Sequence, residues 1–512
     1  MPNRHHDWIA HHAARRPGAV AAVDLASGRR LTYRDFDRRI SALAGHLRDA
    51  CGVGPGARVA LLAQNGTDIL EAQFACFRLG ALFVPLNWRL APAELDAIAA
   101  DCTPAALVHD AEFADGAAGL VERHGIVHRL PRGAGDSPYE RAIAAARPLD
   151  PPHPATHDEP CLILYTSGTT GAPKGAVSTH GTVFWNAVNC ADAAGLTAET
   201  AQLCVLPMFH IAGLNLFANP ILHLGGTVAV MRRFDAGEAL RRLADPALGV
   251  THFHGAPPLY QAMAQHPDFA AADLGRLRVA FVGTAPVPVA LLDAWQHKGV
   301  ALRQGYGLTE TGPMVLNLEA ADAVRKAGSA GKPVLHAEVR VVADAEGRRG
   351  AAAGEVGELW VRGPAVTPGY WNRPEATRAA FAEGGWLRSG DAVRVDEEGF
   401  FFVVDRWKGM FISGGENVYP AEVENVLYRH PAVAEAAVIG VPDERWGEVG
   451  RAVVVPRPGA APTEAELLAH CAASLARYKV PRSVVLADEL PRSAVGKVHK
   501  PTLRQRFGGP AR

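Results

Sequence analysis

The chain has 512 residues, too many for one hydrophobic core, so we expect at least two domains. Hydrophobic residues make up 48% of the chain and charged residues 21%, as in an ordinary globular protein. The formal net charge is -1, from 52 basic and 53 acidic residues. This balance argues against a nucleic-acid partner, which would normally meet a basic face.

Cysteine usage and the apolar runs bear on location. The 7 cysteines are scattered without a CxxC pair, which is typical of free thiols in a reducing compartment. The N-terminal segment MPNRHHDWIAHHAARRPG has no apolar core long enough for a signal peptide. No uninterrupted apolar run reaches the roughly 20 residues that a membrane helix needs. We therefore expect a cytoplasmic protein without a transmembrane segment.

Short β-branched runs alternate with alanine-rich helical patterns through most of the chain. Four such runs are Arg58–Leu62, Leu162–Tyr165, Thr227–Val230 and Arg278–Val282. This alternation predicts α/β architecture with largely parallel sheets. From about Gly354 the pattern changes to short strand-like pieces separated by glycine, which predicts a β-rich segment closing the large domain.

The chain after Gly409 predicts a small independent α+β domain of about a hundred residues. Its elements are expected as helix, strand, strand, helix and strand at Ala421–Arg429, Ala434–Ile439, Arg451–Val455, Thr463–Leu475 and Ser483–Ala487. The prediction is thus a large N-terminal domain of α/β sheets at residues 1–407. A small mobile C-terminal domain would follow at residues 408–512.

The segment YTSGTTGAPKG, residues 165–175, directly follows the apolar run CLIL. Its glycines let the backbone point several N–H groups at one anion. The hydroxyl groups of Ser167, Thr169 and Thr170 add donors, and Lys174 adds a positive charge. These properties suit the β- and γ-phosphates of ATP. The GxxxxGK[ST] pattern of a P-loop is absent, and a flexible surface loop of small residues is the alternative interpretation.

Further motifs follow in order: PMFH (Pro207–His210), YGLTE (Tyr306–Glu310), GELWVRGP (Gly357–Pro364), GYW (Gly369–Trp371), SGD (Ser389–Asp391), DRWK (Asp405–Lys408), SGGENVYPAEVE (Ser413–Glu424) and PRSAVGK (Pro491–Lys497). Together with the glycine-rich loop, this set resembles the signature motifs of the adenylate-forming superfamily from about Leu31 to about Lys500. Within this superfamily, the sequence of the chain is most similar to those of the fatty-acyl and aryl-acyl CoA ligases.

The resemblance implies an AMP-forming acid–CoA ligase that uses ATP, Mg²⁺ and coenzyme A. Such an enzyme adenylates a carboxylic acid, here fatty or of the hydroxycinnamate type, and releases pyrophosphate. It then transfers the acyl group to coenzyme A and releases AMP. Two alternatives stay open: a ligase that loads a carrier-protein phosphopantetheine, and a non-catalytic nucleotide-binding protein.

The resemblance also assigns roles at the nucleotide. Tyr306 would stack on adenine, Thr309 would contact the α-phosphate, and Glu310 would hold Mg²⁺, for which one carboxylate beside a triphosphate is adequate. Asp391 would accept hydrogen bonds from the ribose hydroxyls, and Arg406 would reach the ribose and α-phosphate. The positions matched to nucleotide and CoA binding are Thr166, Ser167, Gly168, Thr169, Thr170, Gly171, Lys174, Gly283, Thr284, Ala285, Gln304, Gly305, Tyr306, Gly307, Asp391, Arg406, Lys408, Gly414 and Gly415.

By the same resemblance, the catalytic set is Lys497, His210, Thr309 and Glu310. Lys497 would bridge the substrate carboxylate and the α-phosphate, where a preplaced cation stabilises the charge that builds up in the transition state. Lys408 would be the hinge about which the small domain rotates between the two half-reactions. The glycines of SGGEN would line the pantetheine tunnel.

Residues matched to the acid pocket are Trp185, His210, Ile211, His254, Gly283 and Gln304. His210 would be a gate between the adenylate and the thiol channel, with a packed core histidine as the alternative. His254 could bond a substituent on an aromatic acid, or it could bind only water. No acidic residue follows PMFH to balance a substrate ammonium, so an amino-acid substrate is disfavoured.

Two charged or polar clusters receive plain interpretations. The pairs His5-His6 and His11-His12 lack cysteine or carboxylate partners at ligand spacing, so we expect a solvated helix face instead of a metal site. The arginine pairs at 232–233 and 241–242 would allow only a weak peripheral membrane contact. The expected partners are the small-molecule acid, ATP and CoA, and a homodimer stays open.

Overall fold

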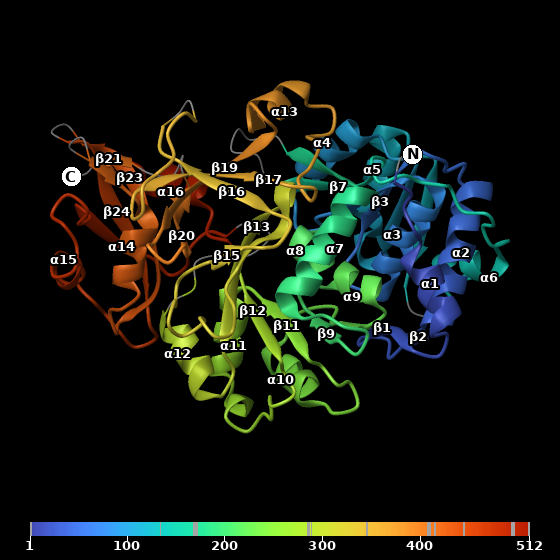
Figure 1. The fold of residues 1–512 in the computed structure, drawn as a ribbon, viewed down its shortest axis with the longest axis horizontal. Coiled ribbons are helices and arrows are strands. Elements are labelled where there is room, and N and C mark those ends of the chain that lie inside the picture. Colours follow the sequence, from blue (N-terminus) through green and yellow to red (C-terminus); the bar gives the residue numbers. More distant parts are fainter. Residues whose placement is uncertain are drawn as a thin grey trace.

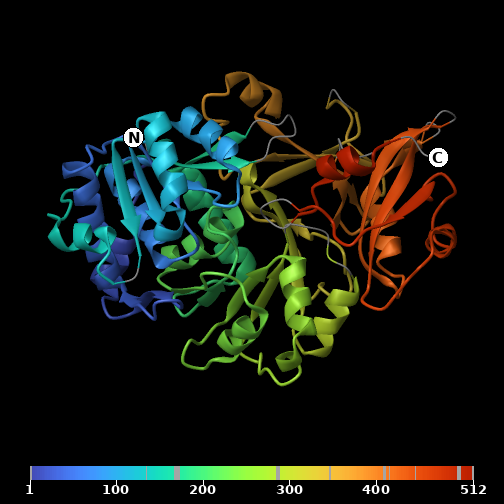
Figure 2. The same cartoon turned by 180° about the vertical axis from the view of Figure 1, so that it is seen from behind.

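The computed structural model describes residues 3–133, 135–166, 173–283, 287, 289–344, 347–406, 411–413, 416–443, 446–492 and 497–509. Figure 1 shows a large N-terminal domain that contains most of the helices and a small C-terminal domain beside it. Figure 2 shows the same two parts from behind. The predicted mixed α/β architecture, with a large first and a small second domain, is confirmed.

A six-stranded sheet forms one half of the large domain. Its order is β6-β5-β3-β4-β7-β8, with β3 (Arg58–Leu62), β4 (Leu82–Leu86), β5 (Ala106–Asp110), β6 (His128–Arg132), β7 (Pro160–Thr166) and β8 (Lys174–Thr179). All pairs are parallel except β7 with β8. Every residue of β4 is buried, as expected for a parallel strand covered on both faces.

A nine-stranded sheet forms the other half, with the order β15-β14-β13-β12-β11-β9-β10-β1-β2. Its strands are β1 (Val20–Asp24), β2 (Arg30–Thr32), β9 (Ala201–Cys204), β10 (Thr227–Val230), β11 (His252–Gly255), β12 (Val279–Val282), β13 (Leu302–Leu308), β14 (Gly312–Asn317) and β15 (Lys332–Pro333). The six strands from β1 to β13 along this order are parallel, and the strands at both edges are antiparallel.

The helices of this domain pack against the two sheets. They are α1 (Trp8–Arg15), α2 (Tyr33–Asp49), α3 (Thr67–Leu79), α4 (Pro92–Cys102), α5 (Ala114–His124), α6 (Pro138–Ala145), α7 (His180–Ala194), α8 (Ile211–Asn215), α9 (Ala218–Leu224), α10 (Ala236–Ala244), α11 (Pro257–Gln265) and α12 (Val289–His297), with short 3₁₀ turns η1 (Ala111–Phe113), η2 (Pro267–Phe269) and η3 (Thr309–Thr311). Helix α3 is buried along its whole length and contacts both β4 and β1, so it joins the two sheets.

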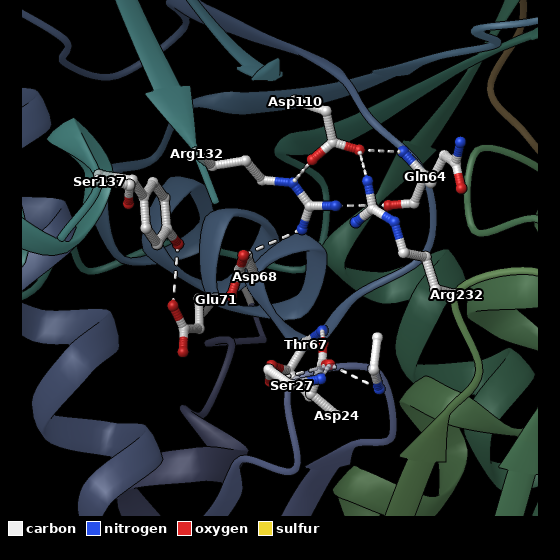
Figure 3. A network of polar contacts seen from close by, with 12 residues as sticks. Asp24, Ser27, Gln64, Thr67, Asp68, Glu71, Asp110, Arg132, Ser137 and Arg232 are labelled. Atoms are coloured by element: carbon white, nitrogen blue, oxygen red, sulfur yellow. Dashed lines mark hydrogen bonds and ion pairs between the residues drawn. The ribbon is translucent and has the colours of Figure 1, made fainter. Parts of the chain in front are cut away.

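A buried ion network reinforces this junction (Figure 3). The Arg132 guanidinium donates to Asp110 at 2.6 Å, to Asp68 of α3 at 3.0 Å and to the carbonyl oxygen of Gln64 at 2.7 Å. Arg232, which follows β10 of the other sheet, donates to Asp110 at 2.9 Å. The guanidinium of Arg132 therefore has a partner on each terminal nitrogen and on Nε, and the network spans both sheets.

Two smaller units follow. The predicted β-rich closing segment is a five-stranded sheet of β16 (Glu338–Val342), β17 (Val356–Arg362), β18 (Phe381–Ala382), β19 (Trp386–Val395) and β20 (Phe401–Arg406), with α13 (Pro374–Ala380) beside it. The C-terminal domain contains β21 (Phe411–Ser413), β22 (Glu416–Val418), α14 (Pro420–Leu427), β23 (Val433–Asp443), β24 (Gly447–Pro456), α15 (Glu464–Ala472), β25 (Ser483–Leu486) and α16 (Lys500–Phe507). Each of the five elements predicted there overlaps an observed helix or strand of the same type.

The N-terminal histidines correct one expectation. His5 and His6 precede α1, and the ring of His5 stacks on His180 with centroids 4.2 Å apart. His12 is buried, and its Nε2 lies 2.9 Å from the carbonyl oxygen of His223. The predicted solvated face was wrong for His5 and His12, whose rings pack into an aromatic cluster, whereas His6 and His11 are exposed as predicted. Within the described ranges, no group of ligand-type side chains is arranged to hold a metal ion. None of the helices described is both long and apolar enough to span a bilayer.

Candidate active site

The strands β11, β12 and β13 end side by side, and their carboxyl ends carry three of the predicted site residues. His254 lies near the end of β11, Gly283 follows β12, and Gln304 lies in β13. The carboxyl edge of a parallel sheet is where open α/β folds bind ligands. The register pairs His254 with Phe281, and Gln304 with Val282. His254 and Gln304 therefore point to opposite faces of the sheet.

The YGLTE motif forms the turn from β13 through η3 into β14. The Tyr306 hydroxyl donates a hydrogen bond of 2.5 Å to Oδ2 of Asp391 on β19, so the predicted adenine and ribose residues lie in contact. Glycine is required at two places in this hairpin because the chain packs closely there. A Cβ at Gly305 would lie 2.1 Å from Phe281, and a Cβ at Gly307 would lie 2.4 Å from the Pro313 backbone.

The glycine-rich loop connects two antiparallel strands. Thr166 and Lys174 face each other where β7 and β8 approach this connection. The predicted phosphate-binding residues Ser167, Gly168, Thr169, Thr170 and Gly171 lie outside the described residues. The flanking strands β7 and β8 are paired as far as Thr166 and Lys174.

Tyr370 links the end of this loop to the predicted metal ligand. Its hydroxyl donates to Oε1 of Glu310 at 2.9 Å, and the Lys174 ammonium lies 5.5 Å from its ring centroid. The backbone beside it pairs with β8, because the Trp371 N–H donates to the Gly175 carbonyl oxygen at 2.7 Å. Tyr370 lies in the GYW motif, but the sequence assigned it no role.

Asp391 and Arg406 lie opposite each other on the antiparallel strands β19 and β20. Asp391 is buried, and its position next to Tyr306 places a carboxylate at the edge of the presumed nucleotide site. The Arg406 side chain lies outside the described part, as do the predicted site residues Thr284, Ala285, Lys408, Gly414 and Gly415.

His210 caps the N-terminus of α8. Its Nδ1 accepts a hydrogen bond from the Ala212 N–H at 3.2 Å, so the ring proton belongs on Nε2. Burial, together with the positive charge of Lys497, lowers the pKa of His210 to about 3. The imidazole is therefore neutral at pH 7 and offers an N–H donor instead of a base. The influence of Lys497 also means that the C-terminal domain brings its predicted catalytic lysine close to His210.

His254 is buried near His210, and its neighbours are aromatic rings. The Phe217 ring centroid lies 6.2 Å from that of His254, and the Phe281 centroid lies 5.8 Å away, both in edge-to-face geometry. Burial, with a further contribution from His210, lowers the pKa of His254 to about 3. Both phenylalanines are buried in the core of the large domain, and sequence analysis did not predict their contact with His254.

Two further predicted residues lie around α7 and α8. Ile211 lines a small cavity together with Thr309, which links the acid side to the YGLTE turn. The Trp185 ring contacts His336 at a centroid distance of 4.9 Å and also contacts Phe184. Among the described residues, no ring contact joins Trp185 to His210 or His254. The structure thus places His210 near enough to His254 to affect its pKa and places Ile211 beside Thr309. The place of Trp185 in the pocket stays a prediction.

Comparisons with known proteins bear directly on this arrangement. The model of the AMP-binding enzyme family matches residues 9–371, and that of the AMP-binding enzyme C-terminal domain matches residues 422–497. The chain belongs to the AMP-binding enzyme family.

Relatives and solved structures of this family match the chain along its whole length. A feruloyl-CoA synthase from Amycolatopsis sp is 46% identical over 98% of both chains. An indoleacetate–CoA ligase from Aromatoleum aromaticum is 41% identical over 98% of this chain and 97% of the relative. The structure of ATP-bound MatB from Rhodopseudomonas palustris superposes with a TM-score of 0.91 at 31% identity, covering 98% of this chain and 99% of that one.

This family member is an AMP-forming acid–CoA ligase, as the motifs predicted. It couples adenylation of a carboxylic acid by ATP to thioester formation with coenzyme A. Small-molecule acid, ATP and CoA are therefore its substrates.

The two arginine pairs, at 232–233 and 241–242, form ion pairs with carboxylates of the same chain. Arg232 and Arg233 both form ion pairs with Glu112, at 2.6 and 2.8 Å. Arg241 and Arg242 both pair with Glu238, at 2.6 and 2.7 Å. These partners neutralise much of the charge that a peripheral membrane contact would use, which disfavours that contact.

Proposed function

We propose that the ligase activates aromatic acids of the hydroxycinnamate type. The observation that carries this proposal is the wall of ring edges at the end of β11 and β12, where Phe217, Phe281 and His254 meet. Flat aromatic acids pack favourably against such edges in offset or edge-to-face geometry. The relatives named for feruloyl and indoleacetate substrates support the same class.

In the proposed adenylation step, two groups act on the acid carboxylate. The neutral His210 donates its Nε2–H, and Lys497 supplies a positive charge beside it. Negative charge grows on the α-phosphate as the carboxylate attacks, so a cation in place stabilises the transition state more than the ground state. Thr309, at the turn after β13, would bond the same phosphate.

The nucleotide would be held by contacts that join distant parts of the chain. Tyr306 would offer its ring face to adenine while its hydroxyl stays bonded to Asp391, whose carboxylate would accept from the ribose. The phosphate loop and Lys174 would take the β- and γ-phosphates, and Arg406 would reach the ribose and α-phosphate.

Glu310 fits the requirements of a Mg²⁺ ligand. Its Oε1 accepts a hydrogen bond from Tyr370, and within the described residues no hydrogen bond engages Oε2. A hard carboxylate oxygen beside a triphosphate is what this ion prefers. When bound, Mg²⁺ would neutralise phosphate charge, while Tyr370 holds the carboxylate in a fixed orientation.

The thioester step would require the small domain to move. We propose a domain boundary at residues 407–408, with rotation about Lys408 that withdraws Lys497 and brings Gly414 and Gly415 to the pantetheine path. The state with Lys497 near His210 is the one suited to adenylation.

The decisive experiment is pyrophosphate release with ATP, Mg²⁺ and CoA across acetate, octanoate, palmitate, benzoate, cinnamate and ferulate. We expect the highest kcat/KM with ferulate or cinnamate. Preference for octanoate or palmitate would overturn the aromatic assignment in favour of fatty acids. Replacing CoA by a phosphopantetheinylated carrier protein tests the acceptor, because turnover only with the carrier would exclude free CoA as the thiol.

A further inference from the structure

The two histidines of β11 differ in how their ring nitrogens are used. His252 is fully paired: Nε2 lies 3.0 Å from the Ala194 carbonyl oxygen, and Nδ1 lies 2.9 Å from the Thr251 hydroxyl. His254 is two residues further along the same face and is equally buried, at 3% exposure. Within the described residues, no hydrogen bond involves the His254 ring, and its enclosed Nδ1 lacks any partner.

An unpaired polar ring in a buried position costs free energy, and buried polar atoms are nearly always bonded. The rings of Phe217 and Phe281 beside it are apolar and offer the His254 nitrogens no hydrogen-bond acceptor. Nε2 of His254 differs from Nδ1 because it has no partner among the described residues but is not fully enclosed. Nε2 is therefore the ring atom that an entering ligand could reach.

Gly283, which follows β12, approaches the ring of His254. A Cβ at Gly283 would lie 3.9 Å from Nε2 of His254 and 3.3 Å from the Gly305 carbonyl oxygen. A larger side chain at this position would thus crowd Nε2 from the side of β12 and β13. Glycine leaves Nε2 available to a ligand from the side of β12 and β13.

The tautomer follows from the enclosed nitrogen. A proton on Nδ1 would leave a buried N–H without an acceptor, and orphaned donors are rarer in proteins than unused acceptors. The favoured neutral ring therefore carries its proton on Nε2 and donates on the side of Gly283.

From this geometry we infer that His254 donates a hydrogen bond from Nε2 to an oxygen substituent on the ring of the aromatic acid. The carboxylate lies at the other end, near His210 and Lys497. The inference deepens the proposed function and rests on it. It specifies acids with a ring hydroxyl or methoxy oxygen, and it disfavours rings whose only polar atom is an N–H donor, because two donors would then face each other.

The test compares kcat/KM for 4-hydroxycinnamate and 4-methoxycinnamate with that for 4-methylcinnamate, which has similar size without the oxygen. In the wild-type enzyme, we expect both oxygen-bearing acids to be preferred by at least about tenfold, because the unpaired Nε2–H is left unsatisfied by the methyl group. His254→Leu should reduce this preference to near unity. His254→Gln keeps an N–H donor and should restore part of it.

Two controls separate a specific role from a structural one. His252→Leu should lower the midpoint of thermal unfolding and leave the oxygen-to-methyl ratio as in the wild type. An unchanged ratio in His254→Leu would overturn the inference while the aromatic assignment stands. Equal ratios in His254→Leu and His254→Gln would also overturn it, since size alone would then account for the preference. Absence of turnover with every cinnamate would instead remove the proposed function itself.

Discussion

The Arg132 network and the histidines at the strand ends are both buried, yet they use polar atoms in opposite ways. Arg132 has partners on all sides, from Asp110, Asp68 and the Gln64 backbone. His254 has no hydrogen-bond partner among the described residues, and within them His210 is bonded only through Nδ1. Satisfied networks hold a fold together, whereas a buried polar group without a protein partner can be completed by a ligand where it lies at a site, as proposed for His254. His180, which also lacks partners, lies in the N-terminal cluster instead.

The two regions also differ in whether their buried groups are charged. The network keeps full charges in the interior because each guanidinium faces a carboxylate. At the strand ends, burial keeps His210 and His254 neutral, with the pKa of each lowered to about 3. The positive charge of Lys497, which acts on His210, comes from the other domain. Variants in the two regions should therefore fail in different ways.

The largest effect is expected from Lys497→Ala. Adenylation should fall by at least about 10²–10³-fold, by analogy with the loss of one transition-state donor. Supplied acyl-adenylate should still react with CoA, so the two half-reactions would be assayed separately by pyrophosphate release and thioester formation. Lys479→Ala, which removes another C-terminal-domain lysine paired with Glu422, is the control. An equal fall in both half-reactions would refute the proposed role of Lys497.

Arg132→Met should act on stability instead of chemistry. Removing Arg132 takes the most buried cation from the network and leaves Asp110 with Arg232 and Asp68 with Arg29. We therefore expect a loss at the lower end of about 3–5 kcal/mol in the free energy of unfolding. The order of substrate preference should stay as in the wild type. Denaturant unfolding of the large domain measures the loss.

The matched control for this variant is Arg241→Ala, whose ion pair with Glu238 is largely exposed. Its effect should stay below about 1 kcal/mol. If Arg132→Met were no more destabilising than Arg241→Ala, the network would not be a structural junction.

The smallest effect is a pH dependence of stability from the N-terminal histidine cluster. Burial lowers the pKa of His180 to about 2 and that of His5 to about 4, while the unfolded chain retains values near 6.5. Below pH 6.5 the unfolded chain binds protons that the folded chain excludes, so stability falls as the pH drops toward 4. We expect about 1–3 kcal/mol over this window.

His180→Phe tests this cluster, because it keeps the ring but removes the titration and two buried nitrogens without hydrogen-bond partners. The variant should be as stable as the wild type at pH 7 and lose less stability at pH 4.5, as measured by thermal unfolding. A steeper loss in His180→Phe would show that other groups govern the acid limb.

The sequence predicted the architecture well because the signals were periodic and repeated. The run Arg58–Leu62 is a strand with the predicted bounds, and Thr227–Val230 likewise. The motifs also predicted contacts between residues far apart, such as Tyr306 with Asp391. The boundary at Lys408 and the phosphate-loop contacts stay predictions, since those residues lie outside the described part.

What the sequence could not supply were contacts across the fold. Whether a histidine is exposed, packed or left without a partner depends on elements distant in the chain, so His5 and His12 were assigned to a solvated face in error. The contact of Phe217 with His254 and the hydrogen bond of Tyr370 to Glu310 were not predicted for the same reason. They join segments brought together only by the sheets.

Trp371 is hydrogen-bonded to the end of the phosphate loop, so its intrinsic fluorescence can report on that part of the enzyme. Its backbone N–H is bonded to Gly175, its indole N–H donates to the Asp101 carbonyl oxygen at 3.3 Å, and the Arg58 guanidinium lies 5.7 Å from its ring. Indole emission responds to nearby charge and to the strength of such bonds. If the triphosphate binds at the loop as proposed, we expect it to change the emission of Trp371.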